Sequence, residues 1–236
     1  MKNIIISAVI IISFSFSFSF SYASESINLQ KAPINLDDKV SLQKGARNFV
    51  NYCLNCHSAS YMRYNRLTDI GLTDDLIKNN LLFTSDKIGN PMSISMKNSD
   101  AKKWFGAAPP NLSVTARSRG ADWIYSYLRG FYRDTSRSMG WNNTIYKNSA
   151  MPHILWELQG EQYIDDKTHE LELKIPGKLY PAEYDQFVGD ITNYMVFMSE
   201  PGQQKRRQIG YYVLAFLFLL LILTINLKKE YWKNIK

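Results

Sequence analysis

Apolar residues recur at helical spacing in three stretches of the chain, and these stretches predict the main helices. The first stretch is Leu42, Ala46, Phe49, Val50 and Cys53, and Asp37, Asp38 or Ser41 can cap its start. The second runs from Ala121 to Phe131. The third starts near Pro181, which suits a first helical position, and its face is formed by Tyr184, Phe187, Val188, Ile191, Met195 and Met198. The chain is therefore predicted to be mostly α.

The segments between these helices carry weaker patterns. Residues 69–81 are predicted to form a second, short helix, and residues 171–180 a strand pair or a turn. Residues 84–111 and 133–152 are predicted to be mostly loop. The fold class is thus a mostly α domain with long loops, to which one C-terminal helix is added.

Two long apolar runs lie outside this domain. Residues 1–23 combine Lys2, an apolar run from Ile4 to about Phe20 and a small-x-small site ending at Ala23, and they are predicted to be a cleaved signal peptide. The alternative is an uncleaved anchor helix. Residues 209–227 contain no charge and are predicted to span a membrane, in preference to a buried core helix. Residues 24–204 then lie in the periplasm and residues 228–236 form a cytoplasmic tail.

The net charge of +7 does not indicate a nucleic-acid-binding protein. Residues 24–204 contain twenty basic and twenty acidic residues, so the predicted exported domain is formally neutral. The excess positive charge flanks the two apolar runs, where membrane lipid explains it.

Cys53, Cys56 and His57 form the motif C-x-x-C-H, the attachment signature of a c-type haem. The cysteines are the only two in the chain, so the motif predicts one covalently bound haem c with His57 as proximal iron ligand. A redox dithiol would need a nearby βαβ pattern, which is absent from the sequence. A zinc site would need further ligands. A chance match is the remaining alternative.

The sixth iron ligand is not determined by spacing. Methionine would give a high-potential electron carrier. The candidates are Met62, Met92, Met96, Met139, Met151, Met195 and Met198. Of these, Met62 is too close to the motif to reach across the ring, and Met195 and Met198 are predicted to be core residues. His153 or His169 would give bis-histidine ligation instead, although His153 is predicted to be structural.

Several motifs resemble those of bacterial cytochrome c1, the haem subunit of the cytochrome bc1 complex. They are AMPHILWELQG (150–160), APPNLS (108–113), RGADWIY (119–125), LRGFY (128–132), GWNN (140–143) and SEP (199–201). The resemblance covers nearly the whole chain from about Lys44. Two departures are Asn111, where relatives commonly have Asp, and Trp123, where many have Tyr.

The resemblance implies that Met151 is the sixth ligand, that Pro109 and Pro110 line the haem pocket, and that Arg117 lies near a haem propionate, with Arg119 second. It also implies a single-pass protein of the bacterial inner membrane. Its partners would be cytochrome b, a Rieske iron–sulphur protein and cytochrome c. The protein would relay single electrons and would not be an enzyme on its own. Two alternatives are a membrane-anchored cytochrome c that feeds a terminal oxidase directly, and a haem-based sensor or binding module.

Overall fold

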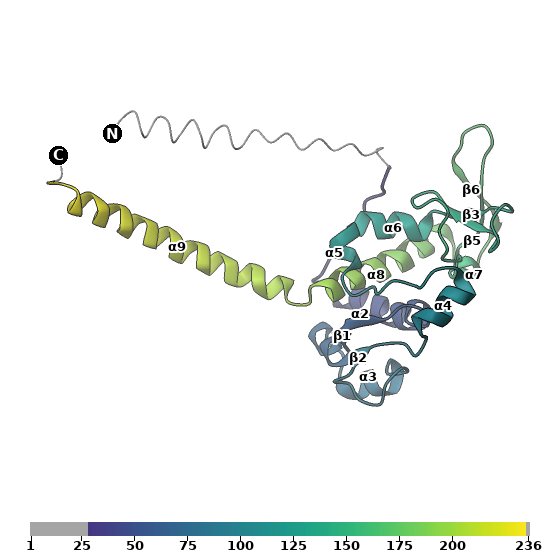
Figure 1. Ribbon diagram of the computed structural model, residues 1–236, viewed down its shortest axis with the longest axis horizontal. Coiled ribbons are helices and arrows are strands. Elements are labelled where there is room, and N and C mark those ends of the chain that lie inside the picture. Colours follow the sequence, from purple (N-terminus) through teal and green to yellow (C-terminus); the bar gives the residue numbers. More distant parts are fainter. Residues whose placement is uncertain (1–27, 235–236) are drawn as a thin grey trace.

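Helices α2 (Lys39–Asn48) and α8 (Pro181–Ser199) pack against each other at the centre of the domain (Figure 1). The computed structural model describes residues 28–234, and the predicted signal peptide lies outside the described residues. The five residues of the first predicted stripe are all buried, from Leu42 to Cys53. The predicted face of α8 is likewise buried, with Phe187 half-buried at its edge. Both helix predictions are confirmed.

The ends of these two helices are set by local chemistry. Asp38 caps α2, since its carboxylate accepts a hydrogen bond from the Ser41 backbone N–H at 3.0 Å. Pro181 is the first residue of α8, and the Glu183 carboxylate accepts from the backbone N–H of Tyr180 at 2.9 Å.

Gly45 permits the close approach of α2 to α8. A Cβ atom at this position would overlap the backbone carbonyl of Asp190 and the Cβ of Tyr194. Polar side chains complete the contact, because Ser41 Oγ donates to the buried carboxylate of Asp190 at 2.6 Å. Asn193 Nδ2 in turn donates to Ser41 Oγ at 3.1 Å. The crossing is therefore close-packed and its buried polar groups are paired.

The Gly45→Ala substitution is expected to lower the free energy of unfolding by about 2–3 kcal/mol, because overpacking forces the two helices apart. For a domain of this size, that corresponds to a fall in the melting temperature of roughly 4–12 °C. Gly89→Ala is the matched control, since nothing lies within 4 Å of a Cβ atom there. Thermal unfolding of both variants tests the prediction, and equal melting temperatures would contradict it.

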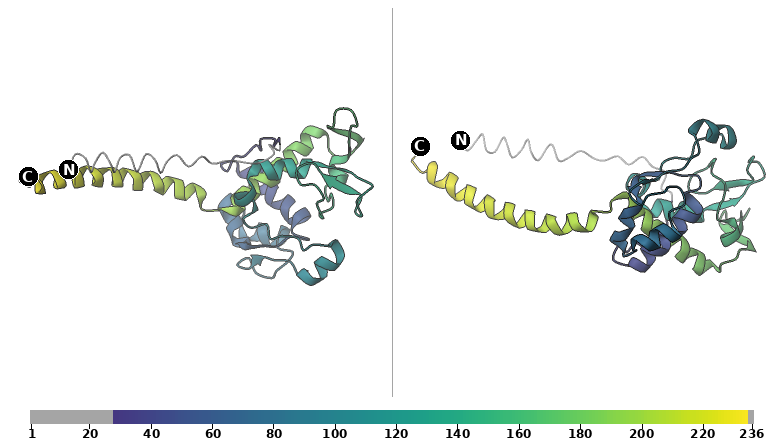
Figure 2. Two further views of the ribbon diagram at one scale, coloured as in Figure 1. Left: turned by 45° about the horizontal axis from the view of Figure 1, so that its top comes forward. Right: turned by 90° about the horizontal axis from the view of Figure 1, so that it is seen from below.

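Shorter elements surround this pair of helices. They are η1 (Phe49–Cys53), η2 (Tyr64–Ile70), α3 (Asp74–Asn80), α4 (Asn98–Phe105), α5 (Thr115–Arg119), α6 (Ala121–Arg129) and α7 (Trp156–Gln159). Three two-stranded antiparallel sheets pair β1 (Ala59–Arg63) with β2 (Pro91–Met92), β3 (Phe131–Arg133) with β4 (Trp141–Asn143), and β5 (Gly160–Ile164) with β6 (Leu171–Pro176). The β5–β6 hairpin lies at the end of the domain far from α9 (Figures 1 and 2). The prediction of a mostly helical domain with long loops is confirmed.

Some predicted boundaries are wrong. The helix expected over residues 69–81 is divided, because Gly71 adopts a left-handed conformation with φ 91° and ends η2. Thr73 then caps the separate helix α3. The stretches 84–111 and 133–152 are mostly loop, as predicted, although the first includes the short elements β2 and α4 and the second includes β4. The expected strand pair over 171–180 is one strand, β6, whose partner β5 lies earlier in the chain.

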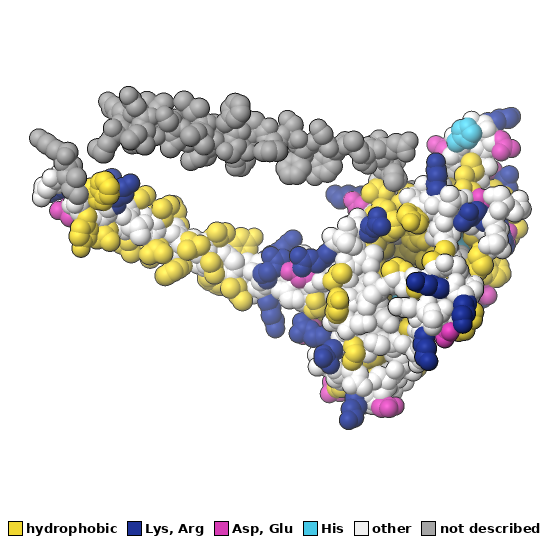
Figure 3. All heavy atoms as spheres, viewed as in Figure 1, with side chains coloured by type: hydrophobic (Ala, Val, Ile, Leu, Met, Phe, Trp, Pro, Cys, Tyr) yellow, Lys and Arg dark blue, Asp and Glu magenta, His cyan; other side chains and the backbone are white. Residues whose placement is uncertain are grey.

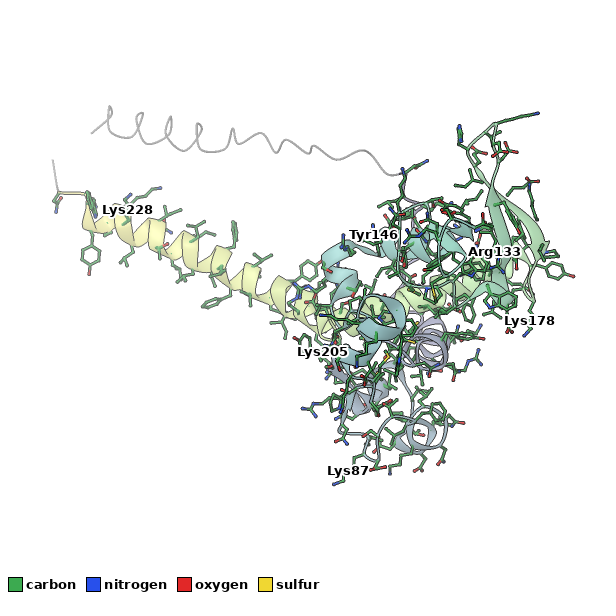
Figure 4. All side chains as sticks on the ribbon, turned by 45° about the vertical axis from the view of Figure 1, so that its right-hand side comes forward. Lys87, Arg133, Tyr146, Lys178, Lys205 and Lys228 are labelled. Carbon is green, nitrogen blue, oxygen red and sulfur yellow. The ribbon has the colours of Figure 1, made fainter. Side chains whose placement is uncertain are left out.

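Helix α9 (Gln203–Tyr231) extends away from the domain and contains the predicted span 209–227. Within residues 28–234, it is the one helix long and apolar enough to cross a membrane, and its side chains are not buried by the rest of the protein. Its 29 residues correspond to about 43 Å. Apolar side chains cover most of α9 (Figure 3), and Lys205 lies where it leaves the domain (Figure 4).

Candidate haem site

The C-x-x-C-H motif begins at Cys53, the last residue of the π-type turn η1 that continues α2. The Leu54 backbone N–H donates to the carbonyl of Phe49, five residues earlier, at 3.0 Å. The carbonyl of Cys53 then accepts from the N–H groups of Cys56 at 3.2 Å and His57 at 2.9 Å. This turn brings the three motif residues together at the end of a helix whose other face is buried in the core.

The two cysteines are free thiols in different environments. Cys53 is buried in the core and Cys56 is half-buried. Burial raises the pKa of Cys53 to about 12, with a smaller contribution from Cys56. Because reactive dithiols and zinc ligands depend on thiolates, this environment does not favour either alternative. Within residues 28–234, no group of three or more His, Cys, Asp or Glu side chains is placed to hold a metal ion.

His57 is oriented by a backbone carbonyl. Its Nδ1 lies 2.8 Å from the carbonyl oxygen of Pro110. Since that oxygen can only accept, Nδ1 carries the proton and Nε2 keeps its lone pair. Burial lowers the pKa of His57, and the Pro110 hydrogen bond opposes this effect. The side chain is thus a buried, neutral imidazole with one fixed tautomer, as an axial iron ligand requires.

A cavity of about 400 Å³ opens beside the motif. It is lined by Cys56, Ser58, Ser60, Ile94, Met96, Asn98, Ala108, Pro109, Pro110 and Asn111. Ser58 holds the walls together, since its Oγ accepts from the Ile94 N–H at 3.1 Å and its carbonyl from the Leu112 N–H at 2.9 Å. Of the motif residues, Cys56 lines this cavity, whereas Cys53 and His57 lie outside its lining. The motif residues and the oriented His57 are the groups that would hold a haem beside it.

The methionines separate by burial. Met62, Met92, Met195 and Met198 are fully packed in the core, which agrees with the prediction for the last two. Met139 is exposed. Met96 is half-buried and lines the cavity. Met151 is half-buried against the core, and its backbone N–H donates to Ser149 Oγ at 3.2 Å. Met96 and Met151 therefore remain as candidate methionine ligands. Met96 lines the cavity and Met151 does not, whereas the sequence resemblance favours Met151.

The two other histidines lie in contrasting places. His153 is 2 % exposed, and its ring stacks on Phe131 with centroids 4.8 Å apart. Burial lowers the pKa of His153 to about 3, although neighbouring Gln159 opposes this slightly. His153 Nε2 has no hydrogen-bond partner among the described residues. His169 is exposed in the turn between β5 and β6, at φ 57°. The packing of His153 agrees with the structural role predicted for it.

The predicted propionate residue Arg117 lies on α5. Its side chain is 65 % exposed, and its Nη1 lies 3.9 Å from a carboxylate oxygen of Glu200. Arg119 instead lies over the ring of Trp123, with its Cζ 5.3 Å from the centroid. Neither side chain lines the cavity described above. The role of Arg117 stays a prediction.

Sequence reasoning missed two contacts that shape the site. The carbonyl of Pro110 orients His57, and backbone acceptors have no signature in a single sequence. The hydroxyl of Tyr127 is hydrogen bonded to Ser149 Oγ at 2.7 Å, beside Met151. In the sequence, Tyr127 lies within the second apolar stretch, residues 121–131, with no sign of its partner. A tyrosine on a buried stripe needs a partner for its hydroxyl, and that need was the available signal.

Comparison with known proteins identifies the family. The profile of the Cytochrome C1 family matches residues 30–235. A Nitrosomonas europaea protein named ammonia monooxygenase gamma subunit is 51% identical over 213 residues, which cover 90% of this chain and 91% of that protein. Cytochrome c1 of Allochromatium vinosum is 45% identical over 219 residues, covering 88% and 90%.

More distant similarity extends to a mitochondrial protein. The haem protein cytochrome c1 of Saccharomyces cerevisiae is 26% identical over 86% of this chain and 70% of its own length. A chain of a hyperthermophilic respiratory complex III aligns with a TM-score of 0.47 and 13% identity. The alignment covers 100% of this chain and 98% of that chain. The profile match and the Allochromatium relative are sufficient: this chain belongs to the cytochrome c1 family, whose cofactor is haem c.

Proposed function

We propose that this protein relays single electrons from a Rieske iron–sulphur protein to a cytochrome c, as the membrane-anchored haem subunit of a quinol–cytochrome c reductase. It would carry one haem c, bound covalently through Cys53 and Cys56. When bound, the haem supplies a one-electron couple whose potential is set by its axial ligands and surroundings. The observation that carries the proposal is the hydrogen bond that orients His57, within a C-x-x-C-H turn of a cytochrome c1 family member.

We assign the roles of the motif residues from their positions and that of Met151 from the sequence resemblance. The cysteines would hold the ring at the end of α2, and His57 would offer Nε2 to the iron, with its orientation fixed by the Pro110 carbonyl. Met151 would supply the second iron ligand. Cys53 and Leu54 are buried in the core and exclude water from one side of the site, whereas half-buried Cys56 leaves an accessible edge. An electron carrier needs no side chain that acts as an acid, a base or a nucleophile.

We further propose that the domain lies on the periplasmic side of the bacterial inner membrane. The N-terminal sequence pattern supports export, and α9 supports a single span beside cytochrome b. Tyr211 and Tyr212 near one end of α9, and Tyr231 and Trp232 at the other, are exposed aromatic residues of the kind that lie at membrane interfaces. Arg117 is assigned to a haem propionate on the sequence resemblance alone.

Purification of the full-length chain in mild detergent tests this function. We expect it to bring down a partner with the absorption spectrum of b-type haem, together with a Rieske protein. One relative is named as an ammonia monooxygenase subunit, which suggests a second possible outcome. Recovery of ammonia monooxygenase polypeptides without b-type haem would overturn the proposal. Recovery with a terminal oxidase alone would overturn it in favour of a direct electron donor.

A further inference from the structure

The chain just before Met151 is held by a pair of hydrogen-bonded hydroxyl groups. The Tyr127 hydroxyl and Ser149 Oγ are 2.7 Å apart, and Ser149 Oγ also accepts the backbone N–H of Met151 at 3.2 Å. Ser149 is buried, and the Tyr127 ring stacks on Trp123 with centroids 5.0 Å apart at 7°. Ser149 thus connects α6 directly to the backbone of Met151.

The chain just after Met151 is held by an aromatic ring. The buried His153 ring lies parallel to Phe131 at 4.8 Å and 6°, and edge-on to Trp141 at 4.9 Å and 80°. The Arg133 guanidinium lies over the Trp141 ring, with its Cζ 3.9 Å from the ring centroid. Arg133 is itself paired with Glu161. The His153 ring therefore packs against aromatic side chains from both strands of the β3–β4 pair.

Both attachments belong to one rigid unit. Tyr127 on α6 and Phe131 at the start of β3 have ring centroids separated by 5.1 Å. Phe131 and Trp141 lie on the paired strands β3 and β4. Asn143 ties these strands to α6, because its Nδ2 donates to the carbonyl of Tyr127 at 2.8 Å. Ser149 and His153, two residues before and two residues after Met151, therefore both contact the unit formed by α6, β3 and β4.

We propose that Tyr127, acting through Ser149, and His153 are positioning residues that hold Met151 where its sulphur can bind the haem iron. The inference rests on the proposed function, in which Met151 is the sixth ligand. A methionine side chain has three rotatable bonds and adapts easily. The fraction of time that its sulphur binds the iron therefore depends on how firmly the backbone of Met151 is held. A ligand whose neighbouring residues are not fixed loses the geometry needed for binding.

The two attachments can be weakened without removing the ligand. Tyr127→Phe deletes only the hydroxyl and keeps the ring on Trp123, so the open, methionine-free state should become about fivefold more populated, the equivalent of one hydrogen bond. Ser149→Ala removes both hydrogen bonds and should have a larger effect. Adding Tyr127→Phe to Ser149→Ala should change the population of the open state little, because the hydroxyl of Ser149 that Tyr127 contacts is already absent. His153→Ala should open the site, and His153→Phe should restore it by keeping the stacked ring.

Carbon monoxide binding to the reduced, full-length haem protein measures the open state, and thermal unfolding is recorded in parallel. Tyr146→Phe is the matched control, since Tyr146 lies in the same loop and is exposed at the surface (Figure 4). We expect faster carbon monoxide binding in the Tyr127→Phe, Ser149→Ala and His153→Ala variants, and native behaviour in Tyr146→Phe and His153→Phe. Met151→Leu is the fully open reference.

The outcomes distinguish the two levels of inference. If Met151→Leu binds carbon monoxide quickly while the Tyr127, Ser149 and His153 variants behave like the native protein, the positioning roles are wrong and the ligand assignment stands. If Met151→Leu itself binds no faster than the native protein, the ligand assignment fails and the positioning roles fail with it. A lower melting temperature in His153→Ala without faster binding would also overturn the proposal, because packing alone would explain it.

Discussion

The Met151→Leu variant is expected to have a markedly lower haem potential and to bind carbon monoxide when reduced. A thioether ligand favours the ferrous state, and axial ligands set haem potentials over a range of about 0.8 V. Leucine has nearly the volume of methionine but no ligand atom, so the half-buried position should remain filled. The shift should therefore reflect coordination and not unfolding. A potentiometric titration of the haem spectrum measures it.

Met96→Leu is the matched control for this prediction. Met96 is also half-buried and lines the cavity beside Cys56. We expect it to keep a potential close to that of the native protein. A native potential in Met151→Leu together with a large fall in Met96→Leu would transfer the ligand role to Met96. Native potentials in both variants would point to a ligand other than these two methionines.

Replacing both Cys53 and Cys56 by alanine is expected to abolish haem retention on a denaturing gel. Thioether bonds survive denaturation, whereas a haem held only by axial ligands dissociates. The native chain should give a band that stains for haem, and the double variant a band that does not, when both are produced in cells competent in haem attachment. His169→Ala should stain like the native protein, since His169 is exposed on a hairpin turn. A stained band in the double variant would contradict attachment at these cysteines.

The sequence predicted the central helices because their burial is periodic. The stripe from Leu42 to Cys53 and the face of α8 both lie in the core, and α9 contains the apolar run expected to span the membrane. Helix α4 was missed because it buries only Ala101 and leaves Trp104 exposed, so it has no apolar face to detect. The helix expected over residues 69–81 is divided in the structure because Gly71 ends η2 and Thr73 caps the start of α3.

The haem motif could be recognised in the sequence because its chemistry requires fixed residue types at a fixed spacing. The contacts that orient the motif residues could not be predicted in this way. The Pro110 carbonyl meets His57 across 53 positions of the chain, and Tyr127 meets Ser149 across 22. Such pairs depend on how the loops fold over the helices, and a single sequence carries no direct record of that.

The most direct test of the proposed electron relay is to follow the c-type haem absorption of the purified membrane complex after quinol is added. We expect the c-type haem to become reduced and added oxidised cytochrome c then to reoxidise it. A c-type haem that stays oxidised while the complex consumes quinol would contradict the proposed electron relay.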